Sequence, residues 1–195
     1  MKVKFKKLVP GAVLPKKATE DSAAYDLYVP EDTTISKGRQ IIPLGFAMEM
    51  EPGYQALVEP RSGFSSKGME GYHVNKEYKV GFNPDFTRIM FEDLPLRKTP
   101  EIECESKIYI ANLPERFDCD VVVGKIDADY REGIGVIVNN RDQRTFVVKA
   151  GTRIAQLTFL QVETAEWEEA DTLSETHREG GFGWTGTTEI NHGDH

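Results

Sequence analysis

Three short segments of the chain bring charged, hydroxyl or glycine residues next to apolar stretches. In PRSGFSSKG (60–68), Arg61 with a hydroxyl and a glycine could hold an anion through side chains and free backbone N–H groups, although a plain β-turn would use the same residues. Asp26 lies at an otherwise apolar strand start, DSAAYDLYVP, where a turn or capping carboxylate is the alternative. Asp127 and Tyr130 lie between two apolar strands, which a simple hairpin would also explain.

Two further segments carry polar residues in contrasting settings. AGTRIAQLTF reads mostly as a core strand, with Arg153 and Gln156 as its polar members. REGGFGWTG, near the C-terminus, mixes an arginine and glycines with Phe182 and Trp184. Because a tail without a binding role would not usually keep two aromatic residues, this segment is a candidate ligand-binding arm.

Several other chemistries are excluded by the sequence. It has no G-x-x-x-x-G-K-[ST] phosphate loop, no G-x-S-x-G nucleophile turn and no H-E-x-x-H zinc motif. Asp127-Ala-Asp129 begins like a calcium loop, but Arg131 and Glu132 occupy the third ligand and glycine positions. The two cysteines, Cys104 and Cys119, form no C-x-x-C pair, so we expect reduced thiols.

Composition narrows the class of protein further. The 195 residues include 24 Lys+Arg and 32 Asp+Glu, a formal charge of −8, which disfavours stable nucleic-acid binding. No stretch approaches the roughly 18 apolar residues of a membrane span, and the basic start lacks the continuous apolar centre of a signal peptide. A phosphate-bearing small molecule remains possible if local arginines, backbone donors or a divalent cation offset the negative field.

The elements that must position these residues are short strands. Apolar stretches separated by Gly, Pro, Asn and Asp at spacings of about ten residues predict an all-β sandwich, jelly roll or barrel. Segment 69–118 breaks the pattern: Asn83-Pro84 predicts the start of a short helix, and 102–110 alternates like a strand. From about 163 the chain is acidic and then glycine-rich, which predicts a flexible arm.

Taken in order, the five segments resemble the homotrimeric dUTPase family, the deoxyuridine triphosphate nucleotidohydrolases. The family's motifs are similar to AAYDL, PRSG, G-x-ID-x-DY, RIAQL and GGFG-x-TG here. The resemblance implies a jelly-roll (β-clip) domain over 1–162, interrupted by an unusually long insertion at 69–118, and a C-terminal arm over 163–195 that carries the lid motif. We expect the insertion to form a small α+β subdomain that is dispensable for catalysis, with a protein-binding surface as the alternative.

The resemblance also implies a reaction and a site. Members of the family hydrolyse dUTP to dUMP and pyrophosphate by water attack at the α-phosphorus, with Mg²⁺ on the triphosphate, which keeps uracil out of DNA. By resemblance, Asp127 is the base, Asp26 meets Mg²⁺ through water, and Gln156 lies at the phosphates. The expected substrate-binding residues are Arg61, Ser62, Gly63, Val121, Gly124, Lys125, Ile126, Tyr130, Arg178, Gly181, Phe182 and Gly183. The family's sites are shared between three chains, and its enzymes are intracellular, so we expect a cytoplasmic homotrimer, in the host cell if the source is viral.

The sequence departs from the family's pattern at several positions. Ala24 replaces a glycine, Glu132 stands where a glycine is usual, and Trp184 replaces a small residue. The tail is one residue short, so His177 rivals Arg178 as the γ-phosphate contact. Two other functions remain open: a dCTP deaminase of the same trimeric fold, and a nucleotide-sensing regulatory protein that uses the insertion as its partner surface.

Overall fold

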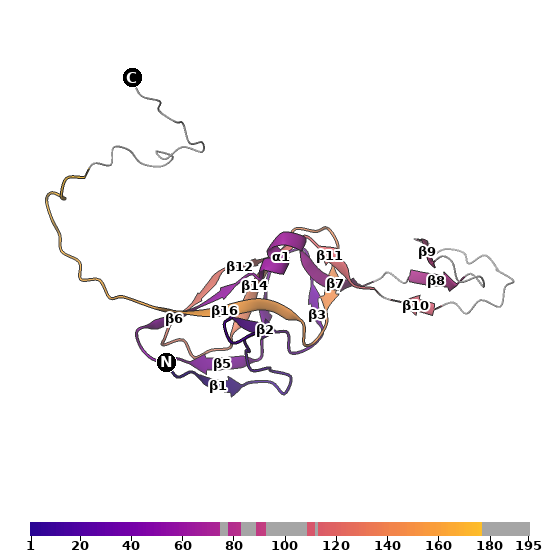
Figure 1. Ribbon diagram of the computed structural model, residues 1–195, viewed down its shortest axis with the longest axis horizontal. Coiled ribbons are helices and arrows are strands. Elements are labelled where there is room, and N and C mark those ends of the chain that lie inside the picture. Colours follow the sequence, from indigo (N-terminus) through magenta and orange to yellow (C-terminus); the bar gives the residue numbers. More distant parts are fainter. Residues whose placement is uncertain (75–77, 83–88, 93–108, 112, 177–195) are drawn as a thin grey trace, which may run out of the picture. The chain divides into compact units, whose positions relative to one another are not determined.

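Short antiparallel strands make up nearly all the regular structure, which confirms the all-β prediction. The computed structural model describes residues 1–74, 78–82, 89–92, 109–111 and 113–176 (Figure 1). One helix, α1 (Ser62–Lys67), lies among them. The strands are β1 (Lys4–Lys7), β2 (Tyr25–Tyr28), β3 (Thr33–Ile35), β4 (Gly38–Pro43), β5 (Phe46–Glu49), β6 (Tyr54–Glu59), β7 (Met69–His73), β8 (Tyr78–Phe82), β9 (Ile89–Glu92), β10 (Tyr109–Ala111), β11 (Glu115–Phe117), β12 (Cys119–Val122), β13 (Gly124–Ile126), β14 (Gly135–Asn140), β15 (Phe146–Val148) and β16 (Arg153–Gln161).

Four sheets build the main body. The sheet that carries most of the candidate site has the order β13-β6-β16-β2 with every pair antiparallel, and β6 and β16 lie side by side in Figure 1. The others have the orders β11-β7-β15-β3, β12-β14-β4 and β1-β5. Neighbouring strands are therefore often distant in sequence, as in the jelly-roll arrangement that the sequence predicts.

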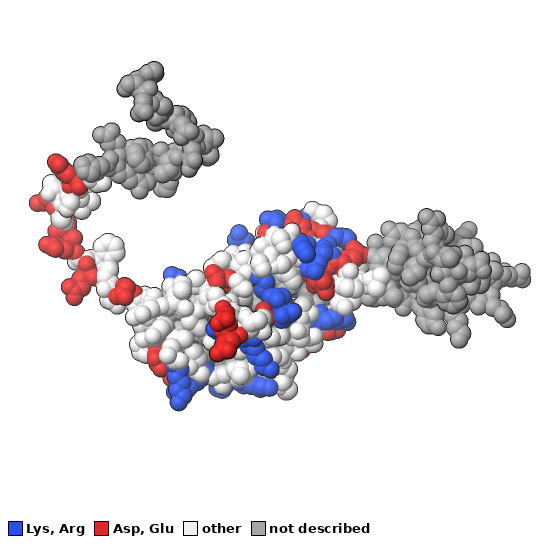
Figure 2. All heavy atoms as spheres, viewed as in Figure 1, with Lys and Arg blue, Asp and Glu red and all other residues white. Residues whose placement is uncertain are grey.

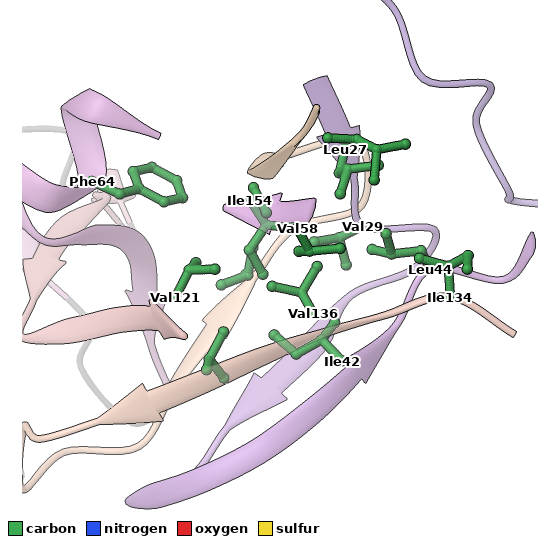
Figure 3. Close-up of a cluster of buried hydrophobic side chains, with 14 of the residues drawn as sticks. Leu27, Val29, Ile42, Leu44, Val58, Phe64, Val121, Ile134, Val136 and Ile154 are labelled. Carbon is green, nitrogen blue, oxygen red and sulfur yellow. The ribbon is translucent and has the colours of Figure 1, made fainter. Parts of the chain in front are cut away.

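Alternation along the strands directs apolar side chains into one core. On β6, Ala56 and Val58 are buried while their neighbours are partly exposed, and Val58 pairs with the buried Leu157 of β16. Because successive strand residues point to opposite faces, the other face of this sheet carries the polar residues. Figure 3 shows the core side chains converging from several strands, with Leu27, Ile42, Val136 and Ile154 among those labelled.

The two ends of the segment expected as an insertion belong to the main body. β7 and β11 pair with each other, and β7 also pairs with β15, so Met69 and Phe117 are fully buried. Arg144 lies over the Phe117 ring at 4.7 Å and forms ion pairs with Glu115 at 3.0 Å and Asp142 at 2.8 Å.

Between these ends, β8, β9 and β10 form a separate sheet with the order β10-β8-β9. The helix expected from Asn83-Pro84 lies outside the described residues. The strand expected over 102–110 meets β10 at 109 and 110, and its remainder is not described.

The chain divides into two units, Met1–Glu163 and Thr164–His195. In the second, residues 164–176 contain no helix or strand, and Trp167 and Leu173 are 96% and 89% exposed. Figure 2 shows acidic and basic side chains interleaved over the face of the main body in view. Within the described ranges, no helix is long and apolar enough to cross a bilayer.

Candidate active site

A buried carboxylate clamped by two arginines lies at the edge strand of the main sheet. Asp26 of β2 is only 8% exposed, and its Oδ1 is 2.9 Å from Nε of Arg61. Its Oδ2 is 3.3 Å from Nη1 of Arg153, and Arg61 Nη1 donates to the Arg153 carbonyl oxygen at 3.2 Å. Two guanidinium groups thus compensate the burial of one carboxylate. The interpretation of Asp26 as a turn or capping residue is therefore wrong, because it is a strand residue with side-chain partners.

Strand register places two more polar residues in a row with Asp26. Gln156 of β16 pairs with Asp26 on one side and with Glu59 of β6 on the other. Directly paired residues point to the same face of a sheet, so all three lie on the face opposite the core. Glu59 accepts a hydrogen bond from the Thr158 hydroxyl at 2.7 Å. The sequence reasoning missed Glu59, although its place two residues before Arg61 could have drawn attention to it.

The PRSG segment forms a helical turn rather than the β-turn considered from sequence. Arg61 is extended, with φ −81° and ψ 140°, and its carbonyl oxygen accepts from the N–H groups of Phe64 and Ser65. Phe64 is buried and anchors α1 against the core, whereas Ser62 and Gly63 are exposed. A Cβ added at Gly63 would meet nothing within 4 Å, so the space beside this turn is open.

Asp127 and Tyr130 are the two ends of one tight turn that follows β13. The Tyr130 N–H donates to the Asp127 carbonyl oxygen at 3.1 Å, and the Tyr130 hydroxyl donates to the Gly133 carbonyl oxygen at 3.2 Å. The Asp127 side chain is exposed. The hairpin alternative is wrong, because β13 pairs with β6 while β14 is held on both edges by β12 and β4.

Beside this turn lies a hollow of about 330 Å³. Four of the predicted substrate-binding residues line it: Gly124, Lys125, Ile126 and Tyr130. A Cβ at Gly124 would meet no atom within 4 Å, so the glycine keeps this part of the hollow open. The remaining lining residues are Ile41, Val58, Gly133, Ile134, Gly135 and Ile137.

Several of these lining residues were absent from the sequence prediction. Gly133, Gly135 and Ile137 alternate along GIGVIV, and that spacing on one strand face was an available signal. Val121, by contrast, was predicted to bind substrate but is 6% exposed on β12 and belongs to the core. Its side chain does not line the hollow, so a contribution would have to come from its main chain.

The two groups of residues are far apart within one chain. Because Gly124 pairs with Val58, Asp127 lies four residues further along the sheet than the row of Asp26 and Glu59. At about 3.3 Å per residue along a strand and about 4.8 Å between strands, the offsets are about 13 Å and about 14 Å. Asp26 and Asp127 are therefore separated by roughly 19 Å in a single chain.

The fit to Mg²⁺ rests on one carboxylate. Among the residues that the structure describes, no group of three or more His, Cys, Asp or Glu side chains could hold a metal ion. Both oxygens of Asp26 are engaged by arginines. Mg²⁺ prefers oxygen ligands and loses its waters reluctantly, so Asp26 suits contact through a metal-bound water when a triphosphate supplies the other ligands. The expected lid residues Arg178, Gly181, Phe182 and Gly183, with His177 and Trp184, lie outside the described residues.

Comparison with known proteins gives concordant results. The dUTPase family profile matches residues 11–83 and 116–186. The deoxyuridine 5'-triphosphate nucleotidohydrolase of Gloeothece citriformis is 33% identical over 190 residues, covering 96% of this chain and 99% of that protein. The protein of the same name from Maricaulis maris is 36% identical over 183 residues, covering 91% of this chain and 90% of the relative.

Solved structures agree at the level of the fold. The Staphylococcus bacteriophage 80alpha dUTPase, determined with dUPNHPP, has a TM-score of 0.64 at 20% identity and covers 95% of this chain and 98% of its own. The dUTPase from phage phi11 of S. aureus, described with a species-specific insert, has a TM-score of 0.58 at 16% identity, covering 90% and 100%.

The antiparallel sheets and their fold-level match to these solved structures place the chain in the class of dUTPase-like β-proteins. With a profile match over most of its length and relatives above 30% identity, the chain belongs to the dUTPase family. The resemblance found from five motifs is thus confirmed. The profile leaves out residues 84–115, a narrower range than the predicted insertion at 69–118.

Proposed function

We propose that this protein hydrolyses dUTP to dUMP and pyrophosphate, which keeps uracil out of DNA and supplies dUMP. The observation that carries the proposal is the hollow beside the Asp127–Tyr130 turn, which is lined by Tyr130 and by Gly124, Lys125 and Ile126 and lies next to the exposed Asp127 carboxylate. The names of the relatives, deoxyuridine 5'-triphosphate nucleotidohydrolases, support the same substrate.

The nucleoside would occupy the hollow. Main-chain groups of Gly124–Ile126, with those of Val121, would read the uracil edge, and the open space at Gly124 leaves room for the base. Tyr130 would lie under the deoxyribose and exclude a ribose 2'-hydroxyl by contact. Asp127, exposed at the rim, would orient the attacking water and accept its proton, a role typically worth about 10²- to 10⁴-fold in rate.

The triphosphate would lie against the second group of residues. Arg61, Ser62 and Gly63 present a guanidinium, a hydroxyl and open backbone for phosphate oxygens, and Gln156 would contact the phosphates from the same sheet face. Mg²⁺ would neutralise phosphate charge and polarise the α-phosphorus. Asp26 would orient its water shell. From the C-terminal arm, Phe182 would stack on uracil, while Arg178, Gly181 and Gly183 would close over the γ-phosphate.

One chain would not complete this site alone. The base and the acid that orients Mg²⁺ must both act near the α-phosphate, yet Asp127 and Asp26 are separated by roughly 19 Å within the chain. A neighbouring copy must supply one of them, which favours the homotrimer with shared sites. A cyclic trimer repeats the same contact three times and so closes three equivalent sites.

The test is pyrophosphate release from dUTP, dCTP, TTP and UTP in Mg²⁺, with ammonia release followed in parallel. Rapid release from dUTP alone is expected. Ammonia from dCTP would identify a deaminase, and tight nucleotide binding without turnover would identify a sensor; either result overturns the proposal. A cytoplasmic location, in the host cell for a viral source, follows from the nucleotide pool on which such an enzyme acts and is part of this proposal.

A further inference from the structure

The side chain of Arg131 forms hydrogen bonds to the turn that carries Asp127 and Tyr130. Its Nη1 donates to the carbonyl oxygen of Ala128 at 2.7 Å and to that of Tyr130 at 3.0 Å. The backbone hydrogen bond from Tyr130 to Asp127 closes the same turn. One guanidinium therefore bridges two carbonyl groups of a four-residue turn whose ends are Asp127 and Tyr130.

Arg131 also lies close to the β1-β5 sheet. With Lys2, Lys4 and Glu49 it lines a hollow of about 500 Å³ beside Ala128. The hydrogen bond and charge of Lys4 lower the pKa of the Glu49 carboxyl, and the charge of Arg131 adds to that effect. Arg131 thus lies between the turn and β5, where both carbonyl dipoles and a carboxylate attract its positive charge.

This arrangement matters because little else fixes Asp127. Among the described residues, the structure gives its side chain no hydrogen bond or ion pair, so its direction depends on the backbone of the turn. The Tyr130 ring is 41% exposed and depends on the same backbone, together with its hydroxyl bond to Gly133. A shift of about 1 Å in such groups is enough to cost about 10²-fold in rate.

We propose that Arg131 is a positioning residue that sets the directions of Asp127 and Tyr130; this rests on the proposed dUTP hydrolysis. Arginine suits the role because its planar guanidinium presents several donors in fixed directions, whereas a lysine ammonium is a single mobile charge. The residue does not contact the substrate. Its effect on turnover and on the choice between deoxyribose and ribose passes through the turn.

The test compares the wild-type protein with Arg131→Ala, Arg131→Lys and Arg141→Ala. Arg141 is a matched control, because it is also exposed and bonds to Asp118 and Asp120, outside both groups of site residues. Three quantities are measured: amide hydrogen exchange over residues 127–131, kcat and KM for dUTP, and the ratio of kcat/KM for dUTP to that for UTP.

For Arg131→Ala we expect exchange at the Tyr130 amide to rise about tenfold, because the turn opens more often. We expect kcat to fall about tenfold, and selectivity for dUTP over UTP to fall by about as much, with the melting temperature within about 2 °C of wild type. Arg131→Lys should recover only part of each loss. Arg141→Ala should change none of them.

Unchanged amide exchange in Arg131→Ala would overturn the proposal that Arg131 holds the turn, whatever happens to turnover. Full recovery by lysine, or an equal loss of selectivity in Arg141→Ala, would also overturn it, since charge alone or a general effect would then explain the result. A wild-type protein that leaves dUTP intact would instead overturn the proposed function. The exchange comparison would still decide whether Arg131 holds the turn.

Discussion

Mixing two inactive variants tests whether one site is built from two chains. Asp26→Asn removes the carboxylate that is clamped by Arg61 and Arg153, and Asp127→Asn removes the proposed base. Each variant alone should lose most turnover. If the two residues act in one chain, mixed assemblies stay inactive; if they come from neighbouring chains, some sites recover both groups.

The expected recovery follows from counting. In trimers formed at random from equal amounts, a site is intact only when an Asp26→Asn chain supplies Asp127 and its neighbour, an Asp127→Asn chain, supplies Asp26. Each condition holds for half of the chains, so about a quarter of the sites in the whole mixture are intact. Each trimer that contains both variants has one intact site among its three, so the isolated doubly tagged trimers should show about a third of the wild-type activity. The separation of roughly 19 Å between Asp26 and Asp127 within one chain is the reason to expect recovery, because it favours a site that takes the two residues from neighbouring chains.

The assay is pyrophosphate release after the two differently tagged variants are unfolded together and refolded. Trimers that carry both tags are isolated first, and each variant refolded alone is the control. Asp26 is buried, and its loss leaves two guanidinium groups without their carboxylate, so Gln156→Ala from the same row serves as a second partner for Asp127→Asn. Doubly tagged trimers with no recovered activity, in both pairings, would refute the shared site and the register argument with it.

Three further outcomes are expected. Asp127→Asn alone should retain the melting temperature and nucleotide binding, since its side chain is exposed, while turnover falls by about 10²-fold or more; an unchanged rate would assign the base elsewhere. Ending the chain after Leu173 should leave a folded trimer with greatly reduced turnover, measured by size and by pyrophosphate release, and loss of the trimer would make the arm structural. Arg144 holds the pKa of Asp142 well below its usual range through paired hydrogen bonds, so the pair stabilises the folded state above about pH 4 and this contribution is lost as pH falls through the lowered value. Asp142→Asn should therefore cost on the order of 1–2 kcal/mol at pH 7, and urea unfolding at pH 2 to 3 should show a smaller difference; an equal cost at both pH values would contradict the ion pair's role.

The sequence predicted the strands well because alternation is a local property. The alternation of Ala56 and Val58 with polar residues predicts, from a few positions alone, that both point into the core. The structure confirms that both are buried. The burial of Asp26 and its pairing with two arginines could not be predicted from local alternation. Its two partners are Arg61 and Arg153, the second 127 residues away, and only strand pairing brings them together.

Motif resemblance named candidate site residues but not their geometry. It named Gly124 and Tyr130 as substrate-binding residues, and the structure places both in the lining of one hollow. It gave no sign that Val121 faces the core or that Ile41 of β4 joins that lining. The residues after Pro60, taken by themselves, were equally compatible with a plain β-turn. The structure has a helix there, because the burial of Phe64 favours the helical turn and depends on the tertiary core.

The pairing of β7 with β11 holds the two ends of the intervening segment side by side. Glu115 pairs with Gly71, so the chain leaves and re-enters the main body on adjacent strands, about 5 Å apart. A folded unit whose own N- and C-termini lie close together could connect these two strands. A longer connection would add little to the entropic cost of bringing the strands together. We therefore expect that the chain between β7 and β11 can be exchanged for another unit, such as a reporter domain, while the buried Met69 and Phe117 keep the two strand ends in the core.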